Sequence, residues 1–263
     1  VNDIARNAAD KLDRCDHIDI YVTDCIWTNK FIPFWWSPET AFGDMAAQPV
    51  NYKNGEYKLV PPFNDPQMIE FRGLGPRRMV DHEHEEPVTF GLFFKDLQTA
   101  TFKYGGPACD LAESLYRMGL LSEEPVQVNG SSVVPLKLVC KLTPPAPSNT
   151  ETIKEALSEG MALEEGATLV RVRGIKDDKA VCLDNYINAP GLTESFEKYG
   201  ITHESFLTGQ SAFLFTKLFV NDMIETRGVF PPEVLGARQR QYYLAEAAKL
   251  GIRVDEIGAT RLY

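Results

Sequence analysis

The segment "MVDHEHEEPVTF" (79–90) holds the densest group of side chains that could do chemistry. Two of the four histidines of the chain, His82 and His84, lie two residues apart in it. Clustered imidazoles and carboxylates shift one another's pKa across the neutral range, which suits proton transfer and the binding of polar ligands. The acidic residues of the segment are Asp81, Glu83, Glu85 and Glu86.

If this segment is a strand, His82 and His84 point to one face and Glu83 and Glu85 to the other. Three interpretations fit that arrangement. Two imidazoles on one face can bind zinc or another divalent metal, although the sequence offers no third ligand in a recognisable pattern. The strand end can also simply face water. The interpretation we favour is a pocket for a cationic or zwitterionic ligand, with His82 and His84 as catalytic residues and Glu83 and Glu85 as substrate-binding residues.

A second conspicuous stretch, "FIPFWWSPET" (31–40), places aromatic residues directly before a Ser-Pro-Glu sequence. These residues can form a core cluster that a turn closes. They can also form an aromatic-walled pocket, in which Trp36, Ser37 and Glu39 contact the substrate.

Composition excludes several classes of function. The 263 residues are 44% hydrophobic and carry a net charge of −10, which argues against a nucleic-acid partner because phosphate binding needs a basic face. No run of eighteen apolar residues occurs, so we expect no membrane span. The five cysteines are widely spaced, which is typical of reduced thiols in a cytoplasmic protein.

Alternating and helical patterns predict an α+β domain built around a mixed, mostly antiparallel sheet covered by helices. Asn54-Gly55 and Asp177-Asp178 are expected at the turns of two hairpins. The first helix is expected to be capped by Asn2 or Asp3. We expect strands at 17–25, 50–60, 99–105 and 167–186, helices at 4–12, 108–119 and 150–157, and a helical C-terminal third.

The expected helix 210–226 is apolar on nearly every side and must therefore be enclosed, by this chain or by a neighbouring domain or subunit. The sequence contains no recognisable nucleotide-binding motif. The loop "GLGPRR" (73–78) lacks the third glycine of a dinucleotide fingerprint and has no strand-turn-helix context.

The order of several segments resembles the C-terminal portion of saccharopine dehydrogenase-like oxidoreductases, a family that includes saccharopine reductase, lysine dehydrogenase and carboxynorspermidine dehydrogenase. The resemblance implies a substrate-binding and dimerisation domain over 1–206. It also implies a C-terminal helical segment over 207–263 that packs on a Rossmann domain preceding Val1. The segments are "HIDIYV", "FWWSPETAFGDMAAQPVNYKNGEY", "VDHEHEEPVTF", "TATFKYGG", "VVPLKLVCKLTPP" and "GQSAFLFTKLFVNDMIETRGVFPPEV".

The resemblance further implies an enzyme, in the form of a homodimer, that uses NAD or NADP on the CH–NH group of an amino-acid or polyamine derivative, by hydride transfer through an imine. Asn2 and Asp3 would then lie near the cofactor. Saccharopine reductase has a carboxylate-binding arginine just after its Trp-Ser pair, whereas this chain has Glu39, which prefers an ammonium group. Two alternatives stay open: a metal-binding module built on His82 and His84, and a non-catalytic dimerisation domain.

Overall fold

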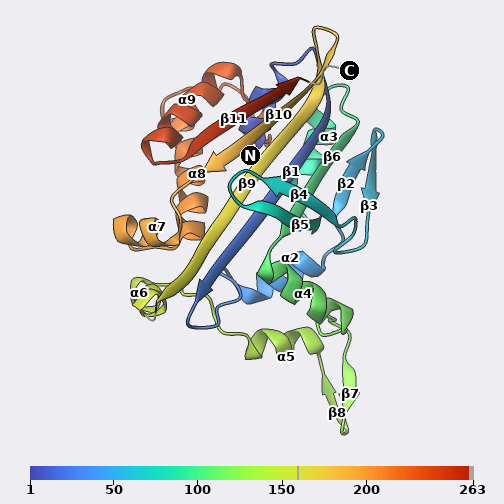
Figure 1. Cartoon of the computed structure of the whole chain (residues 1–263), viewed down its shortest axis with the longest axis vertical. Coiled ribbons are helices and arrows are strands. Elements are labelled where there is room, and N and C mark those ends of the chain that lie inside the picture. Colours follow the sequence, from blue (N-terminus) through green and yellow to red (C-terminus); the bar gives the residue numbers. More distant parts are fainter. Residues whose placement is uncertain (159, 261–263) are drawn as a thin grey trace.

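A computed structural model describes residues 1–158 and 160–260. Within these residues nine strands form one sheet, with the path β11-β10-β9-β1-β6-β2-β3 and with β5 joining β6 and β4 joining β5 (Figure 1). The strands are β1 (Arg14–Thr28), β2 (Val50–Lys53), β3 (Glu56–Leu59), β4 (Gln67–Phe71), β5 (Gly75–Asp81), β6 (Thr99–Gly105), β9 (Met161–Lys176), β10 (Lys179–Asn188) and β11 (Arg253–Thr260). A separate small ribbon pairs β7 (Val126–Val128) with β8 (Ser131–Val133).

Helices accompany the sheet along the chain. They are α1 (Asn2–Ala9), α2 (Pro38–Ala46), α3 (Glu86–Phe93), α4 (Pro107–Arg117), α5 (Pro135–Leu142), α6 (Thr150–Ser158), α7 (Leu192–Tyr199), α8 (His203–Val220) and α9 (Ala237–Lys249), with a 3₁₀ turn at Pro232–Val234. The pairing of β1 with β6 is parallel and the other pairings of the sheet are antiparallel. The predicted fold class, α+β with a mixed, mostly antiparallel sheet, is confirmed.

One face of the sheet forms the main core because β1 and β6 alternate apolar and polar side chains. Ile18 and Ile20 of β1 and Phe102 of β6 pack against α1 and α3 on this face, which we call the helix face. A second cluster on α2 and α4 surrounds Phe42 and includes Tyr104. Side chains of the intervening residues point to the opposite face.

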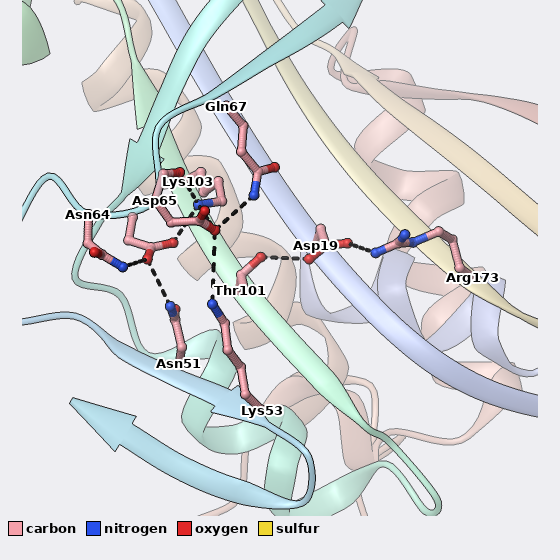
Figure 2. Close-up of polar contacts among 10 residues, drawn as sticks. Asp19, Asn51, Lys53, Asn64, Asp65, Gln67, Thr101, Lys103 and Arg173 are labelled. Carbon is pink, nitrogen blue, oxygen red and sulfur yellow. Dashed lines mark hydrogen bonds and ion pairs between the residues drawn. The ribbon is translucent and has the colours of Figure 1, made fainter. Parts of the chain in front are cut away.

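The opposite face is partly covered by the β4–β5 ribbon, which crosses in front of β1 and β9 (Figure 1). Beside it lie two polar groups: one joins Thr101 of β6 through Asp19 of β1 to Arg173 of β9, and the other surrounds Lys103 of β6 (Figure 2). The Lys103 ammonium group contacts the Asp81 carboxylate at 2.6 Å, and both side chains are at most 1% exposed. Asp81 also accepts hydrogen bonds from Asn51 and Asn64.

Both predicted hairpins are confirmed at the predicted turns. Asn54 and Gly55 connect β2 and β3, and Asp177 and Asp178 connect β9 and β10. All four residues have φ between 50° and 79°, the left-handed conformation that a tight two-residue hairpin turn requires and that Asn, Asp and Gly tolerate best.

Three local predictions were wrong. β5 ends at Asp81, so residues 82–84 have no regular structure, and the next helix begins at Glu86. The first helix starts at Asn2 with Val1 as its N-cap, which leaves Asp3 inside its first turn. The C-terminal third is not wholly helical, because β11 pairs with β10, and the predicted helix 210–226 spans His203–Val220.

The described part of α8 is covered on one side. Phe206, Leu214 and Leu218 are buried, whereas Phe213, Phe219 and Val220 are 51%, 57% and 76% exposed. This chain by itself therefore does not enclose the helix. No helix among the described residues combines the length and apolar character that a bilayer span needs.

Candidate functional site

The two histidines of the 79–90 segment meet on the helix face of β6. The His84 ring stacks on Phe102 with ring centroids 4.0 Å apart and planes 4° from parallel. The His82 ring lies 5.9 Å from the Phe102 centroid and 5.4 Å from that of Tyr104. The backbone N–H of His82 donates to the carbonyl of Phe102 at 3.0 Å, so the coil after β5 still follows β6.

His84 is held as an ion pair. Its Nδ1 contacts the carboxylate of Glu86, which is buried in the first turn of α3, and lies 3.4 Å from Glu85. Burial opposes the positive charge of His84, but Glu86, Glu85 and Glu83 together outweigh it and raise the pKa of His84 above its usual value. At a given pH His84 therefore carries its positive charge more readily than an ordinary histidine.

His82 behaves in the opposite way. Burial, reinforced by the charge of His84, lowers the pKa of His82 to about 4. One imidazole of the pair is therefore neutral at pH 7 while its neighbour takes up a proton more readily, the kind of division that separates acid from base in active sites.

Additional acids surround His84. Burial raises the pKa of Glu83, with Glu85 adding to the effect, and burial also raises the pKa of Asp44 near the end of α2. The charge of His84 acts on both groups. We did not predict Asp44 as a site residue because the pairing of α2 with the 82–86 segment is not visible in sequence.

The expected cofactor residues lie close to this cluster. The Asn2 side chain donates to Glu233 at 2.9 Å. Asp3 is 4% exposed, neither of its carboxylate oxygens has a hydrogen-bond partner among the described residues, and burial raises its pKa to about 6. Residues of α1 share a core cluster with Phe90 of α3, the helix that begins at Glu86, so α1 adjoins the His84 site.

The aromatic stretch has a structural role that accounts for part of its composition. Trp36 packs against Phe34, with ring centroids 5.7 Å apart, and the Ser37 hydroxyl accepts a hydrogen bond from the backbone N–H of Thr40 as the N-cap of α2. Glu39 is exposed. Burial raises the pKa of Cys140 in α5, and the charge of Glu39 adds to this rise. None of the described contacts joins Glu39 to His84, so its role in the substrate site stays a prediction.

A second polar cluster on the helix face was missed in the sequence. The Tyr104 hydroxyl donates to the Asp24 carboxylate, and burial raises the pKa of Asp24. Burial and the charge of Asp24 raise the pKa of Glu204, in the first turn of α8, to about 7. Asp24 continues the alternation of Ile18, Ile20 and Val22, and an acid at such an apolar-face position was the available signal.

Gly106 allows the end of β6 to lie close to β1 at Asp24. A Cβ on Gly106, whose φ is 125°, would lie 2.3 Å from the carbonyl oxygen of Asp24. Because only glycine fits such a close backbone approach at this φ, the end of β6 can pass beside Asp24 and direct Tyr104 at it.

The side chains that could bind a metal ion differ from the predicted pair, His82 and His84. Among the described residues, one nitrogen of His84 and oxygens of Glu85 and Glu86 lie within 4.8 Å of one another, and His82 does not belong to this group. His84 already uses Nδ1 for Glu86. His82 and His84 thus lie near each other because both rings contact Phe102, and they do not form a pair of ligands for one metal ion.

Comparison with known proteins identifies the fold and the family of the chain. The solved structure of apo histidine-tagged saccharopine dehydrogenase (L-Glu forming) from Saccharomyces cerevisiae is similar in fold, with a TM-score of 0.63 and 12% sequence identity, over 98% of this chain and 71% of that chain. Among curated proteins no sequence matches significantly. Residues 26–252 match the saccharopine dehydrogenase C-terminal domain. Since this match covers most of the chain, the chain belongs to the family of saccharopine dehydrogenase C-terminal domains.

Proposed function

We propose that this chain is the substrate-binding part of an NAD(P)-dependent oxidoreductase that acts on the CH–NH group of an amino-acid or polyamine derivative, by hydride transfer through an imine. Membership of an oxidoreductase family supports the reaction class. The observation that carries the proposal is the opposite displacement of two neighbouring histidine pKa values on one aromatic wall.

In this proposal His84 is the proton donor. Its imidazolium form, held by Glu86, protonates the imine nitrogen as the neighbouring carbon is reduced, and it recovers the proton when the amine is oxidised. His82, neutral at pH 7, stays available as a hydrogen-bond partner for the same substrate. The flat contact with Phe102 fixes the His84 ring, so that the proton is delivered from one direction.

The cofactor would supply the hydride carrier. The described residues fit a contact with its nicotinamide end rather than with its phosphates, since the sequence has no dinucleotide fingerprint. The two Asp3 oxygens without partners are acceptors of the type that a carboxamide N–H₂ group needs. Asn2, fixed to Glu233, would support the same contact.

The test compares His84→Gln with His82→Gln in the full protein, using saccharopine, lysine and carboxylated polyamines with either nicotinamide. Because His84 must be protonated for imine reduction, the rate should fall as pH rises through its elevated pKa. His84→Gln should lower kcat by roughly 10²–10⁴-fold and abolish this pH dependence. His82→Gln should keep the pH dependence.

Two results would contradict the proposal. The first is a full protein that turns over none of these compounds with NADH, NADPH or their oxidised forms. The second is a His84→Gln enzyme whose pH profile equals that of the unmodified enzyme.

We further propose a cytoplasmic homodimer. The family resemblance supports the dimer, and the five cysteines, all unpaired in the structure, support a reducing compartment. Sedimentation equilibrium of the full protein measures the first part directly.

A further inference from the structure

A cavity of about 630 Å³ lies on the helix face between the sheet, α7 and α8. Among the residues that the structure describes, its lining includes six carboxylate side chains and neither lysine nor arginine. Such a cavity favours a cation, because the acids on its wall have few positive groups near them. The six are Asp24, Glu164, Glu165, Glu194, Glu197 and Glu204.

Three of these acids already have partners. Glu164 accepts a hydrogen bond from the backbone N–H at the start of α7, Glu165 pairs with Arg77 at 2.8 Å, and Glu194 pairs with Lys198 at 3.4 Å. These contacts offset the negative charge of three of the acids that line the cavity. Asp24 and Glu204 are the acids that interact with each other instead.

The Asp24–Glu204 pair is arranged in a way that a structural role does not explain. Tyr104 directs its hydroxyl at Asp24, and the charges of both Asp24 and Glu204 act on Tyr104, so the three side chains converge. Asp24 and Glu204 line the same cavity, and two carboxylates near each other in a partly dry site repel unless a proton or a cation offsets their charge. One hydroxyl donor satisfies only part of this demand.

A buried histidine on the same wall gives a further indication, and its Nε2 lies 3.6 Å from the Glu204 carboxylate. His203 lines the cavity and is 9% exposed, and its Nδ1 has no hydrogen-bond partner among the described residues. Burial lowers the pKa of His203 to about 4, so at neutral pH it is uncharged and has an acceptor nitrogen as well as a donor. An N–H group of a ligand would satisfy that acceptor.

The neighbouring cavity would take the apolar remainder of such a ligand. It measures about 410 Å³ and shares Asp24 and Ile26 with the acidic cavity, and Trp27, Phe31 and Trp35 form much of its wall. Aromatic walls next to a carboxylate are suited to an alkylammonium chain, through apolar contact and cation–π attraction.

We propose that Asp24 and Glu204 bind the terminal ammonium group of an alkylamine, with His203 as an additional hydrogen-bond partner and the aromatic cavity around the alkyl chain. The inference rests on the proposed function in taking this amine to be one end of the substrate. Tyr104 connects the two regions, because its ring contacts His82 and its hydroxyl binds Asp24.

The experiment measures binding of 1,5-diaminopentane to the chain by calorimetry, with glutarate, of similar length and opposite charge, as the control ligand. Asp24→Asn and Glu204→Gln should each weaken diamine binding about 10- to 100-fold, as expected for the loss of a hydrogen bond to a charged group. Glu197→Gln, an exposed acid on the rim of the same cavity, should change the affinity less than about 2-fold. Far-UV circular dichroism checks that each variant is folded.

A pH series provides a second measurement. Diamine affinity should rise as pH increases through 7, because Glu204 then gains its charge, and Glu204→Gln should remove this rise. The other titratable groups that face Glu204 are Asp24, Tyr104 and His203, and the histidine is already neutral in this range.

Several outcomes would overturn the inference: equal binding of glutarate and diamine, tighter binding of Mg²⁺ than of diamine, or equal losses in the Glu197 and Glu204 variants. Its failure differs from failure of the proposed function. If the full protein is active but Asp24→Asn leaves the KM for amine substrates unchanged, the inference is wrong and the function stands. If the chain binds diamine as described but the full protein has no nicotinamide-linked activity, the inference stands and the function is wrong.

Discussion

The buried ion pair between Lys103 and Asp81 makes the sharpest prediction about what holds the site together. Lys103 uses three short contacts: Asp81 at 2.6 Å, and the carbonyl and carboxylate of Asp65 at 2.9 and 3.1 Å. Asp81 directly precedes His82, and Lys103 lies between Phe102 and Tyr104. The pair therefore connects β5 to β6 on the face of the sheet opposite to the site.

Lys103→Met removes the ammonium group and nearly preserves the length of the side chain. Asp81 is then a buried carboxylate that keeps two amide donors, Asn51 and Asn64, each at 3.0 Å. Breaking a buried pair by removing one partner costs about 3–5 kcal/mol. Because the two amides still stabilise the Asp81 charge, we expect a loss near the lower limit, about 3 kcal/mol.

Urea unfolding followed by circular dichroism measures this loss, and Lys58→Met is the matched control. Lys58 lies on β3 and is 3.9 Å from Glu56 in a solvent-exposed pair, so its replacement should cost less than about 0.5 kcal/mol. The double variant Lys103→Met/Asp81→Leu should lose less than the sum of the two single variants by about 2 kcal/mol. A Lys103→Met loss equal to that of the control would refute the reasoning.

Two other predictions concern acids of the helix face. Asp44→Asn should raise the KM for amine substrates several-fold, because the charge of His84 acts on Asp44. Steady-state kinetics of the full protein measure this effect, and an unchanged KM would contradict the reasoning. Glu204→Gln should raise the free energy of unfolding by about 1 kcal/mol at pH 8 and leave it unchanged at pH 4.5, a moderate value because the carboxylate is partly exposed. The sign follows from a folded pKa of about 7, above its ordinary value, so the penalty is absent at low pH and complete above pH 7. Urea unfolding at the two pH values tests it, and equal effects at both would contradict it.

Patterns of a few residues predicted much of the fold correctly. Alternation along 17–25 and 99–105 identified β1 and β6 and the division of their side chains between two faces. Asn54-Gly55 and Asp177-Asp178 predicted both hairpin turns because left-handed φ values favour these residue types. β11 was missed because a short strand at the end of a helical region depends on pairing with β10 rather than on its own pattern.

The 79–90 segment shows where local reasoning stops. Its composition identified a polar site, and His82 and His84 do share an aromatic neighbour, but the strand that was expected to align them ends at Asp81. Phe102 aligns them instead. The ion pair with Glu86 depends on the start of α3, where a proline in the first turn favours helix.

Residue types and their periodicity in the chain therefore specified which segments become strands, where hairpins turn and which stretch carries titratable groups, since these properties depend on neighbours within a few positions. Tertiary structure alone decided that Asp24, Tyr104 and Glu204 lie near one another and that the pKa values of two neighbouring histidines shift in opposite directions. The register of β1 against β6 and the packing of α8 set these contacts across 80 residues or more. Burial and the distance between charges, which shift a pKa, exist only after those elements have packed.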